Sequence, residues 1–144
     1  MAEPFARIIA SPADGYDRVC ASLPDGQAVV ASPEELRAWL RRIAAECPRP
    51  LLADVVRPDG DRLSVGLGRP QSFLTYIPAD DDPPYFSVLG DDPADEEINF
   101  DCNGESSFYS ASNTVPFELA LEVACRFAAS AGLPLPDVVA WEQL

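Results

Sequence analysis

The 144-residue sequence contains no histidine and no lysine. Without histidine the chain lacks the commonest general base of enzymes, and without lysine it lacks the residue of Schiff-base and P-loop chemistry. A G-x-S-x-G nucleophile elbow is also missing. These absences exclude most familiar enzyme classes, so we expect a protein with no catalytic residues and no cofactor.

Long hydrophobic runs are absent as well. No stretch approaches the roughly 18 consecutive apolar residues of a membrane-spanning helix. The N-terminal segment carries Glu3 where a secretory signal would carry positive charge. We therefore expect a cytoplasmic protein that binds no membrane.

The cysteines form no recognisable metal or disulfide pattern. They are Cys20, Cys47, Cys102 and Cys125. They lie far apart in sequence, form no C-x-x-C pair, and have no histidine beside them to complete a mixed zinc site. We expect reduced and largely buried thiols, because free cysteine is among the most buried residue types.

Basic residues are few and unevenly spread. Residues 1–70 hold nine arginines and ten acids, whereas residues 71–144 hold fourteen acids and one arginine, Arg126. Nearly all of the net charge of -14 therefore belongs to the second half of the chain. Affinity for phosphates requires basic side chains, so binding to nucleic acid is disfavoured and a basic partner is favoured.

Two helices are predicted within a single domain that spans residues 1–144. Ser32-Pro33-Glu34-Glu35 forms a capping box with proline at the first helical position, and apolar residues follow at helical spacing as far as Cys47. A second helix is predicted from Pro116 to about Ala131, where Gly132 would end it.

Short strands separated by turn residues fill the rest of the chain. They are predicted at Gln27–Ala31, Leu51–Arg57, Arg62–Gly68, Ser72–Ile77, Tyr85–Leu89, Ile98–Cys102, Glu105–Ser110 and Asp137–Trp141. Pro58-Asp59-Gly60-Asp61 and Asn103-Gly104 are typical hairpin turns, and Trp141 is expected in the core or at its edge. The predicted fold class is α+β, a meandering and mainly antiparallel sheet of about six to eight strands packed against two α-helices.

Two local sequence patterns could indicate a ligand-binding site. Gly66-Leu67-Gly68 resembles a fragment of a phosphate-binding loop, but no helix follows it, which favours a bulge or close packing. The acids between Asp80 and Glu105 do not have the spacing of an EF-hand loop. A solvated acidic face is the commoner reading there, and weak calcium binding is an open alternative.

Aromatic residues interleave with these acids. They are Tyr76, Tyr85, Phe86, Phe100, Phe108 and Tyr109. Alternation along the strands is expected to send about two-thirds of these rings toward the core and to leave the others outside. Interface hot spots combine desolvated aromatic side chains with complementary charge around them. The predicted partner-binding residues are Asp80, Asp81, Asp82, Tyr85, Phe86, Asp91, Asp92, Asp95, Glu96, Glu97, Asp101, Glu105 and Tyr109.

Several residues also resemble, in order and spacing, a known family. They are Leu63 to Gly68 (LSVGLG), Arg69, Ser72, Tyr76, Pro83-Pro84-Tyr85-Phe86, Gly90, Val115-Pro116, Ala120, Phe127, Gly132, Pro134, Val138 and Trp141-Glu142. Over roughly Ser32 to Glu142 the chain is similar to the Immunity protein 1 family of bacterial polymorphic toxin systems. It departs from the family at Ser106-Ser107-Phe108, where we would expect Thr-Glu-aromatic.

The resemblance implies an α+β immunity protein, encoded beside a secreted toxin that is often a nucleic-acid deaminase, and implies no catalytic residues. We expect the chain to bind one cognate toxin domain with a basic surface, and to neutralise it by occluding its active site or substrate groove. An alternative is an acidic adaptor or regulatory protein that binds another basic partner. A hydrolase that uses two carboxylates is a third reading, and would need a carboxyl group of raised pKa in a cleft.

Overall fold

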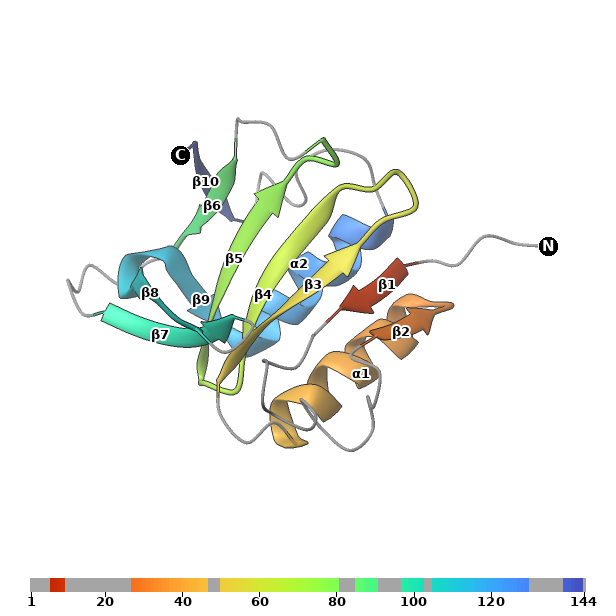
Figure 1. Ribbon diagram of the computed structural model, residues 1–144, viewed down its shortest axis with the longest axis horizontal. Coiled ribbons are helices and arrows are strands. Elements are labelled where there is room, and N and C mark those ends of the chain that lie inside the picture. The colour runs from red at the N-terminus through yellow and green to blue at the C-terminus, as the bar shows by residue number, and fades with distance from the viewer. Residues whose placement is uncertain are drawn as a thin grey trace.

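The computed structural model describes residues 6–9, 27–46, 50–80, 85–90, 97–102, 105–129 and 139–143, and gives the backbone alone at residues 27, 101, 102, 105–109 and 143. Within these ranges the chain forms ten strands, two α-helices and one 3-10 turn (Figure 1). The α+β class, the antiparallel sheet and the two helices agree with the sequence prediction.

The element bounds, in chain order, are β1 (Ala6–Ile9), β2 (Gln27–Val30), α1 (Pro33–Glu46), β3 (Leu51–Val56), β4 (Arg62–Leu67), β5 (Gln71–Ile77), β6 (Phe86–Leu89), β7 (Glu97–Cys102), β8 (Glu105–Ser110), η1 (Ala111–Asn113), β9 (Thr114–Pro116), α2 (Phe117–Ala129) and β10 (Ala140–Gln143).

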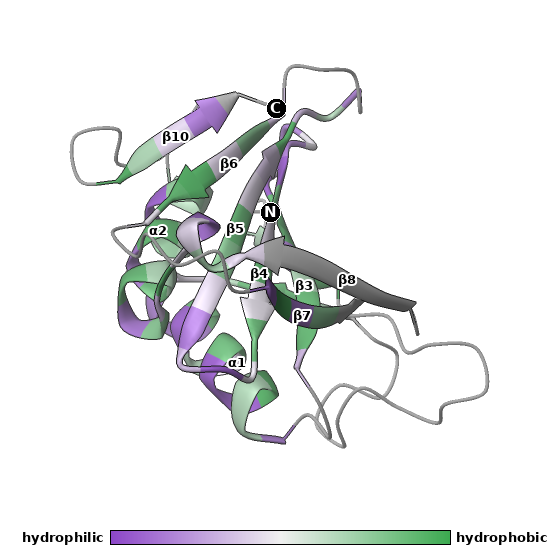
Figure 2. Ribbon diagram, turned by 90° about the vertical axis from the view of Figure 1, so that its left-hand side faces the viewer, coloured by the Kyte–Doolittle hydropathy of each residue, from purple (hydrophilic) through white to green (hydrophobic). Residues whose placement is uncertain are grey.

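Seven strands lie side by side in the order β10-β6-β5-β4-β3-β1-β2. The neighbours along this path are antiparallel. The β7–β8 hairpin joins the sheet through one parallel pair, Leu51 with Asp101, and β9 pairs with β5. Figure 2 shows both helices on one side of the sheet and the β7–β8 hairpin on the other.

Strand alternation builds the main core between the sheet and the helices. Leu63, Val65 and Leu67 of β4 are completely buried on the helix side, where Leu40 of α1 and Phe127 of α2 meet them in one cluster. Burial of such side chains contributes about 1.5–3 kcal/mol each. This core therefore packs α2 against the central strands of the sheet.

The opposite face of the sheet is closed at one end by Phe100 of β7. Phe100 is completely buried, and a Cβ atom added to Gly66 of β4 would lie 2.7 Å from its ring. Gly66 is thus a site of close packing, as the sequence favoured over a phosphate loop. This contact fixes the β7–β8 hairpin across the sheet.

The N-terminus of α1 is capped as its sequence predicts. The hydroxyl of Ser32 accepts a hydrogen bond from the backbone N–H of Glu35 at 3.1 Å. The carboxylate of Glu35 accepts from the N–H of Ala31 at 3.2 Å, one residue earlier than in a standard capping box. The first bond satisfies a donor that a helix start otherwise leaves unpaired, and the second ties the preceding residue to the first turn.

Some predicted boundaries are wrong. The second helix begins at Phe117 and not at Pro116, because residues 114–116 pair with β5 as strand β9. The last strand is Ala140–Gln143 and not Asp137–Trp141, and residues 137 and 138 lie outside the described ranges. The sequence did not predict β1 or β9. No helix formed by the described residues is long and apolar enough to span a membrane.

Candidate partner-binding surface

Strand β6 divides the predicted acidic segment. Asp80 and Tyr85 flank its start, whereas Gly90 and Glu97 follow its end. Four strand residues extend about 13 Å at 3.3 Å each. A partner that contacts the described residues at both ends must therefore cover the length of β6.

The described members of the predicted site differ in exposure. Asp80 and Glu97 are exposed, whereas Tyr85 and Phe86 are half-buried. The rings of Phe86 and Tyr76 meet edge to face, with 6.5 Å between ring centroids. The structure describes only the backbone of Asp101, Glu105 and Tyr109, and the remaining predicted residues Asp81, Asp82, Asp91, Asp92, Asp95 and Glu96 lie outside the described ranges.

Leu89, which the sequence analysis did not single out, is exposed at the end of β6. Its relative exposure is 39%, and it pairs in register with the exposed Ala140 of β10. Its predecessor Val88 is completely buried. Successive strand residues point to opposite faces, so Leu89 lies on the face away from the buried Val88, and nothing in the local sequence pattern marks it as exposed.

The backbone around Leu89 is fixed by residues between β8 and α2. The N–H of Gly90 donates to the carbonyl of Ser112 at 2.7 Å, and a Cβ atom on Gly90 would lie 1.8 Å from the carbonyl oxygen of Thr114. The side-chain amide of Asn113 donates to the carbonyl of Val88 at 2.9 Å. Leu89 is therefore presented to solvent on a well-supported backbone.

A buried arginine lies near the other end of β6. Arg57, at the end of β3, is 4% exposed and places its guanidinium 4.4 Å from the ring centroid of Phe127. It donates to Asp61 at 2.7 Å, to Asp59 at 3.3 Å and to the carbonyl of Phe127 at 3.3 Å. These acceptors compensate a buried charge that would otherwise cost several kcal/mol.

Tyr76 and Asp61 complete this network. The Tyr76 hydroxyl donates to Asp61 and accepts from Arg57 at 2.8 Å. Burial, followed by the hydrogen bond to Asp61, raises the pKa of Tyr76 to about 12. Burial alone would raise the pKa of Asp61, but hydrogen bonds from Tyr76, the N–H of Ala79 and Arg57 outweigh it and hold that pKa below its usual value.

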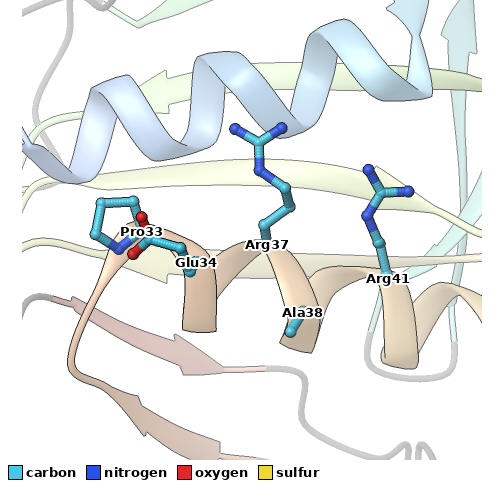
Figure 3. Close-up of a pocket in the computed structure, with 5 residues that line it drawn as sticks. All are labelled: Pro33, Glu34, Arg37, Ala38 and Arg41. Carbon is cyan, nitrogen blue, oxygen red and sulfur yellow. The ribbon is translucent and has the colours of Figure 1, made fainter.

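Arginines of α1 pair with acids of α2. Arg37 donates to Glu122 at 2.9 Å, and Arg41 forms a two-pronged pair with Glu118 at 2.8 and 2.7 Å. Figure 3 shows both arginines extending from α1 toward α2. Together with Pro33, Glu34 and Ala38 they line a cavity of about 270 Å³. Arg126, the single arginine of residues 71–144, donates to Glu122 at 3.0 Å.

The described carboxyl groups do not resemble a hydrolase pair. Those with a displaced pKa are Asp61 and Glu122, and both pKa values are lowered, the latter by hydrogen bonds from Arg37 and Arg126. An acid catalyst needs the opposite shift. In the part of the chain that the structure describes, no three histidine, cysteine or acidic side chains cluster closely enough to hold a metal ion.

Cys125 is the cysteine whose side chain the structure describes. It is a free, buried thiol that donates to the carbonyl of Pro33 at 3.5 Å, and burial raises its pKa. It therefore joins α2 to the start of α1 as an ordinary core residue. Cys20 and Cys47, and the side chain of Cys102, lie outside what is described.

Comparison with known proteins identifies the family. Residues 25–143 match the family described as Immunity protein Imm1, which is most of the chain. No protein with a curated description matches the chain. Members of an immunity family neutralise toxins and are typically non-catalytic, and membership implies a cognate toxin as the partner. The chain therefore belongs to the Immunity protein Imm1 family.

Proposed function

We propose that this immunity protein neutralises a toxin that acts on nucleic acid, a deaminase in the class that the family resemblance implies, by occupying its substrate groove. The observation that carries the proposal is the charge of residues 71–144, fourteen acids against one arginine. An enzyme that binds nucleic acid needs a basic groove for the phosphates. An acidic surface of this kind is its electrostatic complement.

The ion pairs that the arginines form support the proposal that an acidic surface faces the toxin. Two carboxylates of α2, those of Glu118 and Glu122, accept hydrogen bonds from three arginines. The arginines are Arg37, Arg41 and Arg126. The pairs of Arg37 and Arg41 hold α1 against α2, whereas the pair of Arg126 lies within α2. The acids that flank β6 are then the ones that face a partner.

Occlusion requires two kinds of contact. Acids such as Asp80 and Glu97 attract a basic groove over a distance and raise the association rate. Contacts of half-exposed apolar side chains, here Tyr85, Phe86 and Leu89, keep the complex together and set the dissociation rate. One chain would then block one toxin in the cytoplasm, with no reaction of its own.

The proposal is tested with the product of the adjacent gene. Its toxin domain is purified and assayed for deamination of single- and double-stranded nucleic acid while the immunity protein is titrated into the reaction. We expect complete inhibition at one equivalent, and a mass of the complex that corresponds to one copy of each chain. Toxin that another immunity protein protects against serves as the specificity control.

Each other outcome is informative. If the chain inhibits a toxin that catalyses a different reaction, the immunity function would be supported and the deaminase assignment would be refuted. Binding that leaves toxin activity unchanged would refute occlusion. If the product of the adjacent gene does not bind, the result would favour the alternative function, an acidic adaptor that binds another basic partner.

A further inference from the structure

The β3–β4 turn contacts the segment that precedes the first acidic stretch. The carboxylate oxygen Oδ1 of Asp61 accepts a hydrogen bond from the backbone N–H of Ala79 at 2.8 Å, and Ala79 immediately precedes Asp80. A Cβ atom added to Gly60 would lie 2.9 Å from the Cβ of Ala79. The turn therefore packs directly against the chain as it leaves β5.

The second oxygen of Asp61 is held from inside the protein. Oδ2 accepts from Arg57 at 2.7 Å and from the hydroxyl of Tyr76. Arg57 is itself 4% exposed and fixed over the ring of Phe127. The Asp61 side chain thus joins a rigid buried network to the exposed end of β5.

The same network reaches the start of β6. Tyr76 pairs in register with Phe86, and the two rings meet edge to face at 6.5 Å and 72°. Phe86 directly follows Tyr85 in the chain. Both ends of the connection between β5 and β6, which carries Asp80 and Tyr85, are therefore attached to the Arg57–Asp61–Tyr76 network.

We propose that Asp61 is a positioning residue for toxin binding, one that fixes the backbone at Ala79 and with it the position of the adjacent Asp80. The inference rests on the proposed function, because it takes Asp80 and Tyr85 to contact the toxin. A backbone that is already held at Ala79 before binding loses less conformational entropy in the complex. Asp61 accordingly increases the affinity for the toxin by holding Ala79, and it does not itself contact the toxin.

The chain offers a closely matched pair of variants. Asp59 lies in the same turn, carries the same charge, and also accepts from Arg57 at 3.3 Å and from the backbone N–H of Asp61 at 3.0 Å, but Ala79 bonds to the side chain of Asp61. We expect Asp61→Ala to raise the toxin dissociation constant about tenfold, the loss of one hydrogen bond to a charged acceptor. Asp59→Ala, with the same charge change, keeps the hydrogen bond between Asp61 and Ala79 and is expected to bind within about twofold of the parent chain.

Two further variants separate positioning from stability. Tyr76→Phe removes a hydroxyl from the network but keeps the Ala79 contact, so it should lower the melting temperature and leave the dissociation constant unchanged. Asp61→Asn offers one acceptor oxygen to three donors, and should weaken binding several-fold. If Asp61→Ala does not fold, the binding measurement is made with Asp61→Asn instead.

Hydrogen exchange of the Ala79 amide tests the positioning in the free protein. Exchange should be faster in Asp61→Ala than in Asp59→Ala, whether or not a toxin is present. Equal toxin affinities of the Asp61 and Asp59 variants would overturn the proposal, as would weaker binding by Tyr76→Phe of the same size as by Asp61→Ala. If the parent chain does not bind the toxin, the proposed function fails, and the exchange measurement still decides whether Asp61 fixes Ala79.

Discussion

The guanidinium of Arg57 lies 4.4 Å from the ring centroid of Phe127, stacked where the last turns of α2 cross the end of β3. The same guanidinium donates to the backbone carbonyl of Phe127 at 3.3 Å. One arginine thus ties the helix layer to the β3–β4 hairpin. A carbonyl near a helix C-terminus also favours a nearby positive charge.

Replacement of Arg57 by methionine should destabilise the fold strongly. It leaves Asp61 partly buried without its charged partner, and breaking a buried pair from one side costs about 3–5 kcal/mol. The loss is measured by urea unfolding. Arg41→Met is the control, because the pair of Arg41 with Glu118 is 48% and 64% exposed and should contribute little. Similar losses for the two variants would contradict the role given to Arg57.

The alkaline limb of the stability curve should depend on Tyr76. Its pKa in the folded protein is raised to about 12, above the value of about 10 for an unfolded tyrosine. The stabilisation is therefore complete below pH 10 and is lost as the pH rises from 10 toward 12. The chain contains no lysine, so fewer groups titrate in this range.

This dependence is measured as the urea midpoint of unfolding between pH 8.5 and 11.5. Tyr76→Phe should be less stable than the parent chain at pH 8.5, and the difference between the two should shrink as the pH rises. A difference that stays constant across this range would show that the ionisation of Tyr76 does not contribute.

Gly66 and Phe100 should be energetically coupled. A methyl group at residue 66 would lie 2.7 Å from the Phe100 ring, so Gly66→Ala is expected to destabilise by about 1–3 kcal/mol through overpacking. Phe100→Leu alone should also destabilise, because it removes a completely buried ring. The double variant should be more stable than the sum of the two losses predicts, which a double-mutant cycle measures. Additive losses would refute the contact.

Local patterns predicted much of the fold. The capping box at Ser32, the β3–β4 hairpin and the β7–β8 hairpin are all present, because each is specified by residues close in sequence. Strand β1 was missed because its four residues are held by pairing with distant strands β2 and β3. Strand β9 was missed because Pro116 is typical of a helix start.

The site was harder to predict than the fold. The acids and aromatics remain a prediction from the sequence. An arginine at the end of a hairpin strand looks like a surface residue, and the burial of Arg57 depends on Phe127, 70 residues later. In the same way Leu89 looks like a core residue of a short strand. Its exposure follows from where β10 and the residues near Ser112 lie, which no local pattern specifies.

Charge steering should be separable from close contact. Joint replacement of Asp80, Asp81 and Asp82 by asparagine removes three negative charges near the start of β6. We expect the association rate with the toxin to fall several-fold at low ionic strength and to approach that of the parent chain at about 1 M salt, where the screening length is about 3 Å. Stopped-flow measurements at several salt concentrations test this. An association rate that does not change at low salt would refute steering.

Leu89 and Val29 provide a matched test of the contact surface. Both are exposed apolar strand residues, at 39% and 63%, but Leu89 lies on β6 beside the acidic stretches and Val29 lies on β2 at the opposite margin of the sheet. If Leu89 packs against the toxin, Leu89→Ala should raise the dissociation rate about tenfold with little change in the association rate, because short-range packing is lost only in the bound state. Val29→Ala should leave both rates unchanged. Equal effects of the two variants would place the interface elsewhere, and an effect of Val29→Ala alone would move it to the β2 edge.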